Sequence, residues 1–229
     1  SPCVVDRTAK LELAAKRIAF GKLLNCGQTC VAPDYILVER SVKDEFLVYL
    51  KKWIVRMYGA DATENDAYVK MINQKHFDRV TGLIDPKKVV FGGGWNERTM
   101  QIQPTILDDV TAEDAVMQEE IFGPIFPILP VDSMAEAEEF IRKREKPLAL
   151  YLFTQNKALA ERFLRYVPFG GGCINDTIIH LATSRMGFGG VGGSGMGSYH
   201  GKKSFETFSH EKSIVNKHTW MDLPVRYAP

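Results

Sequence analysis

The 229-residue chain lacks an excess of either charge: 29 Lys and Arg residues face 28 Asp and Glu residues, a net charge of +1. This balance gives no electrostatic reason to expect binding to nucleic acid or to an anionic membrane surface. The chain also lacks an apolar run of about 18 residues, which a membrane-spanning helix needs. Its first residues, 1–5, contain no basic segment before a long apolar one. We therefore predict neither a signal peptide nor a membrane anchor.

Cysteine is scarce, and its four positions show no paired framework: Cys3, Cys26, Cys30 and Cys173. In a chain of this length without a signal peptide, that pattern indicates reduced thiols and a cytoplasmic protein. The five histidines form no HExxH motif and no cluster with cysteine at zinc-ligand spacing. We therefore predict no metal site.

Helix-like and strand-like segments alternate along the chain. Apolar residues at a 3.6-residue period predict helices over 8–24, from 41 onward, over 73–84, 133–144 and 157–166. Short apolar runs predict strands at 35–38, 88–91, 125–131, 148–153 and 171–175. Acids three residues after Ser41 and Ser133 suggest capping boxes. The alternation indicates an α/β fold with a largely parallel sheet flanked by helices.

The last part of the chain differs in composition. Residues 187–197 hold seven glycines in eleven positions, and a polar segment follows. Gly187, Gly189 and Gly192 fit the dinucleotide fingerprint, but no long strand precedes them and no acid follows at the required distance. Close backbone packing is the better interpretation of these glycines. We predict one catalytic domain over 1–198 and an extended C-terminal tail over 199–229.

The tetrad Gly27-Gln28-Thr29-Cys30 stands between a predicted helix and a predicted strand. A thiolate is a strong nucleophile that forms thioesters, and glycine allows close approach of a substrate. Taken alone, the tetrad favours a buried packing cysteine, which is the commonest fate of a free thiol. Cys26 near the helix end, and Cys3 and Cys173 in strand-like runs, are predicted to be core residues.

A second short string, residues 119–124, offers a carboxylate and an aromatic ring before a Gly-Pro turn. Glu120 could act as a base or bind ribose hydroxyls, and Phe122 could stack on a planar ring. Taken alone, a surface acid with a core phenylalanine explains the string better.

Together these strings resemble the aldehyde dehydrogenase superfamily. The motifs that carry the resemblance are Leu23-x-x-x-Gly27-Gln28-x-Cys30, the string 119–124 and the glycine loop 186–197. The sequences of segments 29–35, 144–151 and 199–210 are similar to those of the class 3 branch, whose members oxidise fatty and aromatic aldehydes. The resemblance covers nearly the whole chain.

The resemblance implies residue roles. Cys30 would attack the aldehyde carbon, hydride would pass to NAD or NADP, and water would release a carboxylic acid. The backbone N–H of Cys30 would help bind the oxyanion. Glu120 would contact the nicotinamide ribose and has been considered as a base, while Phe122 would position the nicotinamide. Asn175 and His200 would shape the substrate entrance.

The resemblance also implies that a cofactor-binding domain, an oxyanion asparagine and a second glutamate precede this sequence in family members. We therefore expect the isolated chain not to oxidise aldehydes at a useful rate. Family members pair a strand of one subunit with the sheet of the other, so we expect a homodimer or self-association through an open edge.

Other interpretations remain open at this stage. Cys30 could serve a cysteine-dependent esterase or acyltransferase that uses no nicotinamide. The chain could also be a non-catalytic dimerisation module with an inert Cys30. An acylating member of the superfamily, which makes CoA thioesters, is a further alternative, although the class 3-like sequence segments argue against it.

Overall fold

A seven-stranded sheet forms the centre of the protein in the computed structural model, which describes residues 1–227. Its strand order is β3-β6-β7-β2-β1-β8-β9, and only the pair β3–β6 is antiparallel. The strands are β1 (Cys3–Val5), β2 (Ile36–Glu39), β3 (Val89–Phe91), β6 (Thr105–Leu107), β7 (Ile125–Val131), β8 (Ala149–Phe153) and β9 (Gly171–Ile174). The predicted α/β class with a largely parallel sheet is confirmed.

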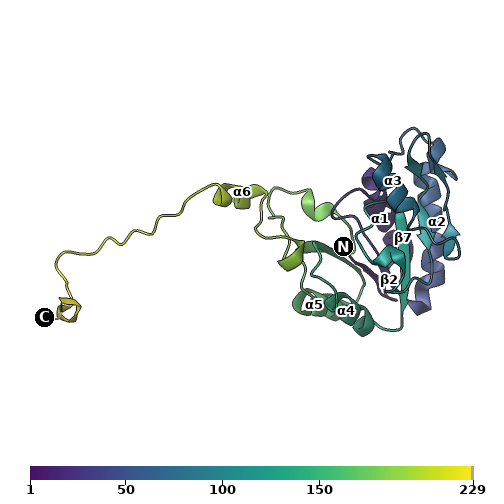
Figure 1. Ribbon diagram of the computed structural model, residues 1–229. Coiled ribbons are helices and arrows are strands. Elements are labelled where there is room, and N and C mark those ends of the chain that lie inside the picture. The colour runs from purple at the N-terminus through teal and green to yellow at the C-terminus, as the bar shows by residue number, and fades with distance from the viewer. Residues whose placement is uncertain (228–229) are drawn as a thin grey trace.

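Helices flank this sheet (Figure 1). Their bounds are α1 (Leu11–Leu23), α2 (Lys43–Tyr58), α3 (Gln74–Thr81), α4 (Met134–Arg142) and α5 (Lys157–Tyr166). The central strands read as continuous apolar runs because both faces are covered, and every residue of β1, β2 and β8 is buried. The apolar stripe predicted for the first helix is confirmed, since Ala14, Ala15 and Ile18 lie in the core.

Two helix starts follow the expected chemistry and one does not. Asn73 caps α3 by accepting the N–H of His76, and Ser133 caps α4 by accepting the N–H of Glu136. The capping box predicted at Ser41 is wrong. A 3-10 turn (Arg40–Val42) precedes α2 there, and the helix begins at Lys43 without a side-chain cap.

The strand predicted at 88–91 is confirmed as β3, but the sequence pattern missed the strands between β3 and β7. Two-residue strands, β4 (Trp95–Asn96) and β5 (Gln101–Ile102), form an antiparallel hairpin. The strand β6 pairs with both β3 and β7. Strands of two or three residues are too short to show an alternating pattern, so periodicity could not identify them.

The glycine-rich segment packs backbone against backbone. A Cβ atom at Gly189 would overlap the carbonyl oxygen of Gly197, and one at Gly190 would overlap that of Ser194. This confirms the predicted close packing. Phe188 and Tyr199 exchange two backbone hydrogen bonds, of 2.7 and 2.9 Å, across the predicted domain boundary at 198/199.

A short helix, α6 (Gly201–Thr207), follows this bridge, and the chain then runs away from the domain (Figure 1). Side chains 205–227 of this tail are exposed, and the last two positions of the predicted tail lie outside the described residues. Within residues 1–227, no helix is both long and apolar enough to cross a membrane.

Candidate active site

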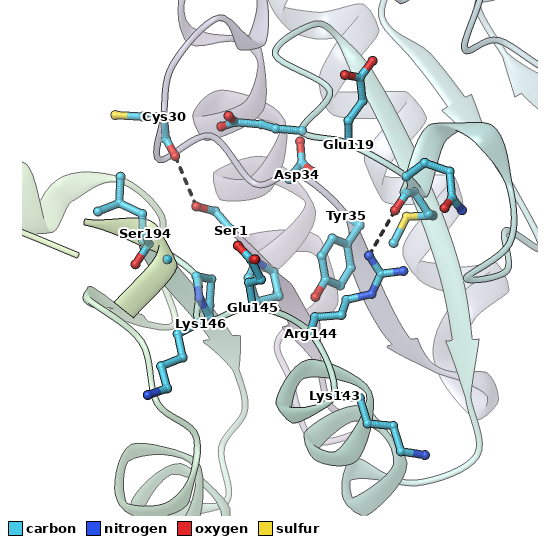
Figure 2. A pocket seen from close by; sticks show the side chains of 17 residues that line it. Ser1, Cys30, Asp34, Tyr35, Glu119, Lys143, Arg144, Glu145, Lys146 and Ser194 are labelled. Carbon is cyan, nitrogen blue, oxygen red and sulfur yellow. Dashed lines mark hydrogen bonds between the residues drawn. The ribbon is translucent and has the colours of Figure 1, made fainter. Parts of the chain in front are cut away.

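A cavity of about 740 Å³ opens at the amino-terminal edge of the parallel strands. Its walls come from the segments that lead into β1, β2, β7 and β8, together with the end of the glycine-rich segment (Figure 2). Both predicted catalytic residues, Cys30 and Glu120, line it. Segments about 90 residues apart in the sequence are therefore brought together because their strands lie side by side in the sheet, as β2 and β7 do.

Cys30 is exposed, which overturns the interpretation of this cysteine as a buried packing residue. The Ser1 hydroxyl donates to the carbonyl oxygen of Cys30 at 3.2 Å (Figure 2). The next carbonyl, that of Val31, accepts a 2.6 Å bond from the buried hydroxyl of Tyr151. The backbone that carries and follows the thiol is therefore held in place, while Cys30 lines the cavity and its side chain is exposed.

The loop before Cys30 has an unusual backbone. Asn25, Cys26 and Gly27 have φ values of 53°, 57° and 74°, the left-handed region that side chains other than glycine seldom adopt. A Cβ atom at Gly27 would overlap the backbone carbonyl of Gly123. Glycine is required here both for its φ and for this contact, which places the Cys30 loop directly against the Glu120 string.

The side chain of Gln28 attaches the same loop to a third segment. Its Nε2 donates to the carbonyl of Lys70 at 3.1 Å, and its Oε1 accepts the N–H of Ile72 at 2.9 Å. The amide thus pairs with the backbone of 70–72 as a neighbouring strand would.

The other three thiols lie in settings that hold them protonated, as predicted for core residues. Burial raises the pKa of Cys26 to about 11, despite the hydrogen bond of its sulfur to the Tyr68 hydroxyl at 3.3 Å. Burial also raises the pKa of Cys3 and Cys173, although Cys173 is only half-buried.

Two side chains, those of Arg79 and Asp34, hold the backbone around Glu120. The guanidinium of Arg79 on α3 donates to the carbonyl of Glu120 at 3.2 Å and to that of Ile121. Arg79 also forms a 3.2 Å ion pair with Glu119. From the opposite side, Asp34 Oδ1 accepts the N–H of Ile121 at 3.1 Å. Position 120 is therefore clamped between α3 and the segment entering β2.

Glu120 carries a raised pKa. Burial is the largest cause, and the negative charge of Asp34 adds to it, while the Ser1 amino group, Lys22 and Arg79 act in the opposite direction. A carboxylate with a raised pKa is a better proton acceptor near neutral pH than an ordinary surface glutamate.

Phe122 lies two residues beyond Glu120 and outside the lining of the cavity. Its backbone φ is 49°, and its ring is 37% exposed. A partly exposed ring beside the cavity fits stacking on a planar group, and a ring in the core would not.

The structure does not bring Asn175 to this cavity. Asn175 follows β9 at the carboxyl-terminal edge of the sheet, where its side chain bonds the backbone of Thr154 at 2.9 and 2.8 Å. His200 stacks on Phe188 at a centroid distance of 5.7 Å and is also absent from the cavity lining. The substrate-entrance roles of these two residues stay predictions.

Four residues that sequence reasoning missed hold this site: Lys22, Gln28, Asp34 and Arg79. Lys22 had a signal, because it continues the buried stripe of Ala15 and Ile18 at helical spacing and is fully buried. Asp34 and Arg79 had none, since their contacts are with a string 40 or more residues away. Within residues 1–227, no group of three or more His, Cys, Asp or Glu side chains could hold a metal ion.

The fold and cavity define an α/β domain in which an exposed thiol and a carboxylate line the same cavity. The chain belongs to the aldehyde dehydrogenase family, whose family model matches residues 1–214. The chain is 50% identical over its whole length to half of 4,4'-diaponeurosporen-aldehyde dehydrogenase of Staphylococcus aureus. It is 51% identical over 95% of its length to 48% of the rat dimeric NADP-preferring aldehyde dehydrogenase.

Solved structures agree with these relatives. The substrate-bound Staphylococcus aureus AldH superposes with a TM-score of 0.95 at 49% identity, over all of this chain and 50% of that one. A NAD-dependent aldehyde dehydrogenase from Sinorhizobium meliloti gives a TM-score of 0.84 at 25% identity, over 97% of this chain and 46% of that one. The chain thus spans about half the length of these relatives.

Proposed function

We propose that this chain carries the nucleophile of an NAD(P)-dependent aldehyde dehydrogenase that oxidises aldehydes to carboxylic acids. The observation that carries the proposal is the placement of an exposed Cys30 and of Glu120 on the walls of one cavity. The names of the relatives, which include NADP-preferring and NAD-dependent aldehyde dehydrogenases, support the same activity.

The chemistry begins at Cys30. Its thiolate adds to the aldehyde carbon and forms a thiohemiacetal, whose oxyanion is bound by the Cys30 backbone N–H. Loss of hydride leaves a thioester on the sulfur, and hydrolysis then releases the carboxylic acid and restores the thiol. Glu120, with its raised pKa, accepts a proton from the attacking water in this scheme.

The residues on this chain fit a nicotinamide cofactor. The carboxylate of Glu120 in the cavity wall offers acceptors for ribose hydroxyls, and the partly exposed Phe122 offers a ring face for a planar group. Hydride acceptance is the chemistry that bound NAD or NADP supplies. The resemblance of residues 29–35, 144–151 and 199–210 to the class 3 branch supports fatty and aromatic aldehydes as the substrate class.

The test is iodoacetamide labelling of the chain at neutral pH, with all four cysteines mapped against time. We expect Cys30 to react well before Cys3, Cys26 and Cys173, and benzaldehyde or hexanal to slow the labelling of Cys30 only. Cys173 is the matched control, because it is half-buried but lies outside the cavity. Equal labelling rates, or no effect of aldehyde, would contradict the proposal.

The effect of a nicotinamide dinucleotide on Cys30 distinguishes the proposed dehydrogenase from the alternative, a cysteine-dependent hydrolase. A hydrolase would cleave 4-nitrophenyl acetate through Cys30 at a rate that NAD and NADP leave unchanged. Under the dehydrogenase proposal, the dinucleotide alters the reactivity of Cys30, since Glu120 and Phe122 contact it beside the thiol.

We also propose that the chain forms a homodimer. The printed name of the rat relative calls that enzyme dimeric. In this chain β9 is an edge strand that pairs only with β8 among the described strands. Sedimentation equilibrium measures the assembly directly, and a monomer at high concentration would contradict the expectation.

A further inference from the structure

Lys22 is the most unusual charged residue of the core. It stands in the last turn of α1, its side chain is fully buried, and its Nζ has no hydrogen-bond acceptor within residues 1–227. A lysine normally extends its ammonium to water while burying only its aliphatic stem. An ammonium that stays inside without a hydrogen bond is costly, so a compensating charge is expected nearby.

The compensating charge is Asp34. Its Oδ1 lies 4.0 Å from Lys22 Nζ. The same oxygen accepts the N–H of Ile121 at 3.1 Å. One carboxylate oxygen therefore joins a buried cation on α1 to the peptide that follows Glu120.

Glu120 and Asp34 both line the cavity, and the negative charge of Asp34 disfavours ionisation of Glu120. The positive groups that oppose this repulsion at Glu120 are the Ser1 amino group, Lys22 and Arg79. Arg79 also forms an ion pair with the exposed Glu119, so its positive charge is divided between Glu119 and Glu120. Burial lowers the pKa of Lys22, and the negative charges of Asp34 and Glu120 act in the opposite direction and favour its ammonium form.

We propose that Lys22 is a positioning residue for Glu120: its buried ammonium orients Asp34 to hold the Ile121 N–H and offsets the negative charge of the two carboxylates. This deepens the proposed function and rests on it, because it explains how Glu120 remains ionisable beside a second acid. A purely structural role as a cation at the carboxyl end of α1 is the competing explanation.

The titration of Glu120 separates the two explanations. The chain is labelled with ¹³C at glutamate carboxyls, and Glu120→Gln identifies the Glu120 signal by NMR. We expect Lys22→Met, which keeps the length of the side chain, to move the Glu120 midpoint to higher pH. The Ile121 amide should also exchange faster with solvent in this variant, because Asp34 is no longer held. Lys22→Arg should restore both measurements.

An unchanged Glu120 midpoint and Ile121 amide in Lys22→Met, with only a lower melting temperature, would overturn the proposal. If Lys22→Met does not fold, Asp34→Asn decides in its place. Removing that negative charge should move the Glu120 midpoint to lower pH, and an unmoved midpoint would again overturn the proposal.

This experiment needs neither aldehyde nor cofactor. A shifted Glu120 midpoint together with a Cys30 that aldehyde does not protect would sustain the role of Lys22 and reject the dehydrogenase. Protection of Cys30 with an unmoved Glu120 midpoint would do the reverse.

Discussion

The loop that carries Cys30 and the tail beyond the glycine-rich segment are held in different ways. Around Cys30, the bonds come from residues far away in sequence: Tyr151 binds the carbonyl of Val31, and Gln28 binds 70–72. In the tail, Thr207 bonds residues 198 and 203, and side chains from 205 onward are exposed. Long-range buried contacts position the thiol, whereas local contacts alone leave the tail on the outside.

The difference suggests where substitutions should matter. A change in the Cys30 loop should disturb the core and the cavity together, because the same backbone serves both. An equivalent change in the tail should affect only its own neighbours. The following four predictions test this contrast in order of decreasing effect.

The largest effect is expected from Cys30 compared with Cys26, four residues earlier. In a whole enzyme that contains this chain, Cys30→Ser should lower aldehyde oxidation at least about a thousandfold because the nucleophile is lost. Its melting temperature should stay near that of wild type, since the thiol is exposed. Cys26→Ala should instead cost about 1 to 2 kcal/mol of unfolding free energy, because it empties a buried site beside Tyr68. Enzyme assays and urea unfolding check the pair.

A reversed pattern, with Cys26→Ala inactive but stable, would mean that the two thiols have been assigned to the wrong roles.

Gly27→Ala compared with Gly197→Ala isolates the contribution of the contact with Gly123. Both glycines have left-handed φ values, 74° and 82°, so both variants carry the same backbone strain of about 1 kcal/mol. Only at Gly27 would the new Cβ also overlap another backbone atom, and at Gly197 it meets nothing within 4 Å. We expect Gly27→Ala to cost about 2 to 4 kcal/mol in total and to change the labelling rate of Cys30.

Equal losses of stability in these two variants by thermal unfolding would show that backbone strain alone matters at Gly27.

Gln28→Ala should cost about 1 to 2 kcal/mol, because two hydrogen bonds to 70–72 are lost and their backbone partners must find water. Gln28→Glu is the matched variant, since it keeps an acceptor for the Ile72 N–H but cannot donate to Lys70. Hydrogen exchange of the Ile72 amide reports on the hydrogen bonds between Gln28 and residues 70–72. We expect the Ile72 amide to lose its protection in Gln28→Ala and to keep it in Gln28→Glu. No loss of protection in either variant would show that these bonds do not hold the loop.

The smallest effect concerns pH and Glu120. The folded-state pKa of Glu120 is raised, mainly by burial, so the unfolded chain releases this proton first as pH rises. The contribution of Glu120 to stability is therefore present below its unfolded pKa and is lost as pH rises through its folded pKa. Glu120→Gln should have a higher melting temperature than wild type near neutral pH, and the difference should vanish below about pH 4.

Glu119→Gln is the control for this comparison, because it removes the neighbouring carboxylate, which pairs with Arg79, and leaves Glu120 in place. A constant difference between Glu120→Gln and wild type at every pH would argue against a raised pKa.

The sequence by itself predicted the sheet class, most helices and strands, and the two strings that meet at the cavity. Apolar periodicity and local turn chemistry depend on neighbours along the chain, so a sequence contains them directly, as at α5 and β7. Pattern alone favoured a buried Cys30 and a surface Glu120, and only the motifs taken together indicated a shared site.

Only the tertiary structure decided which charges surround that site. The pairing of Lys22 with Asp34, and the bonds of Asp34 and Arg79 to residues 120–121, join segments separated by tens of residues. The parallel order of β1, β2, β7 and β8 brings their leading segments to one edge, and it places Asn175 at the other. Burial and the distance between charges are properties of that arrangement, so the pKa of Glu120 follows from the fold and not from the string in which Glu120 stands.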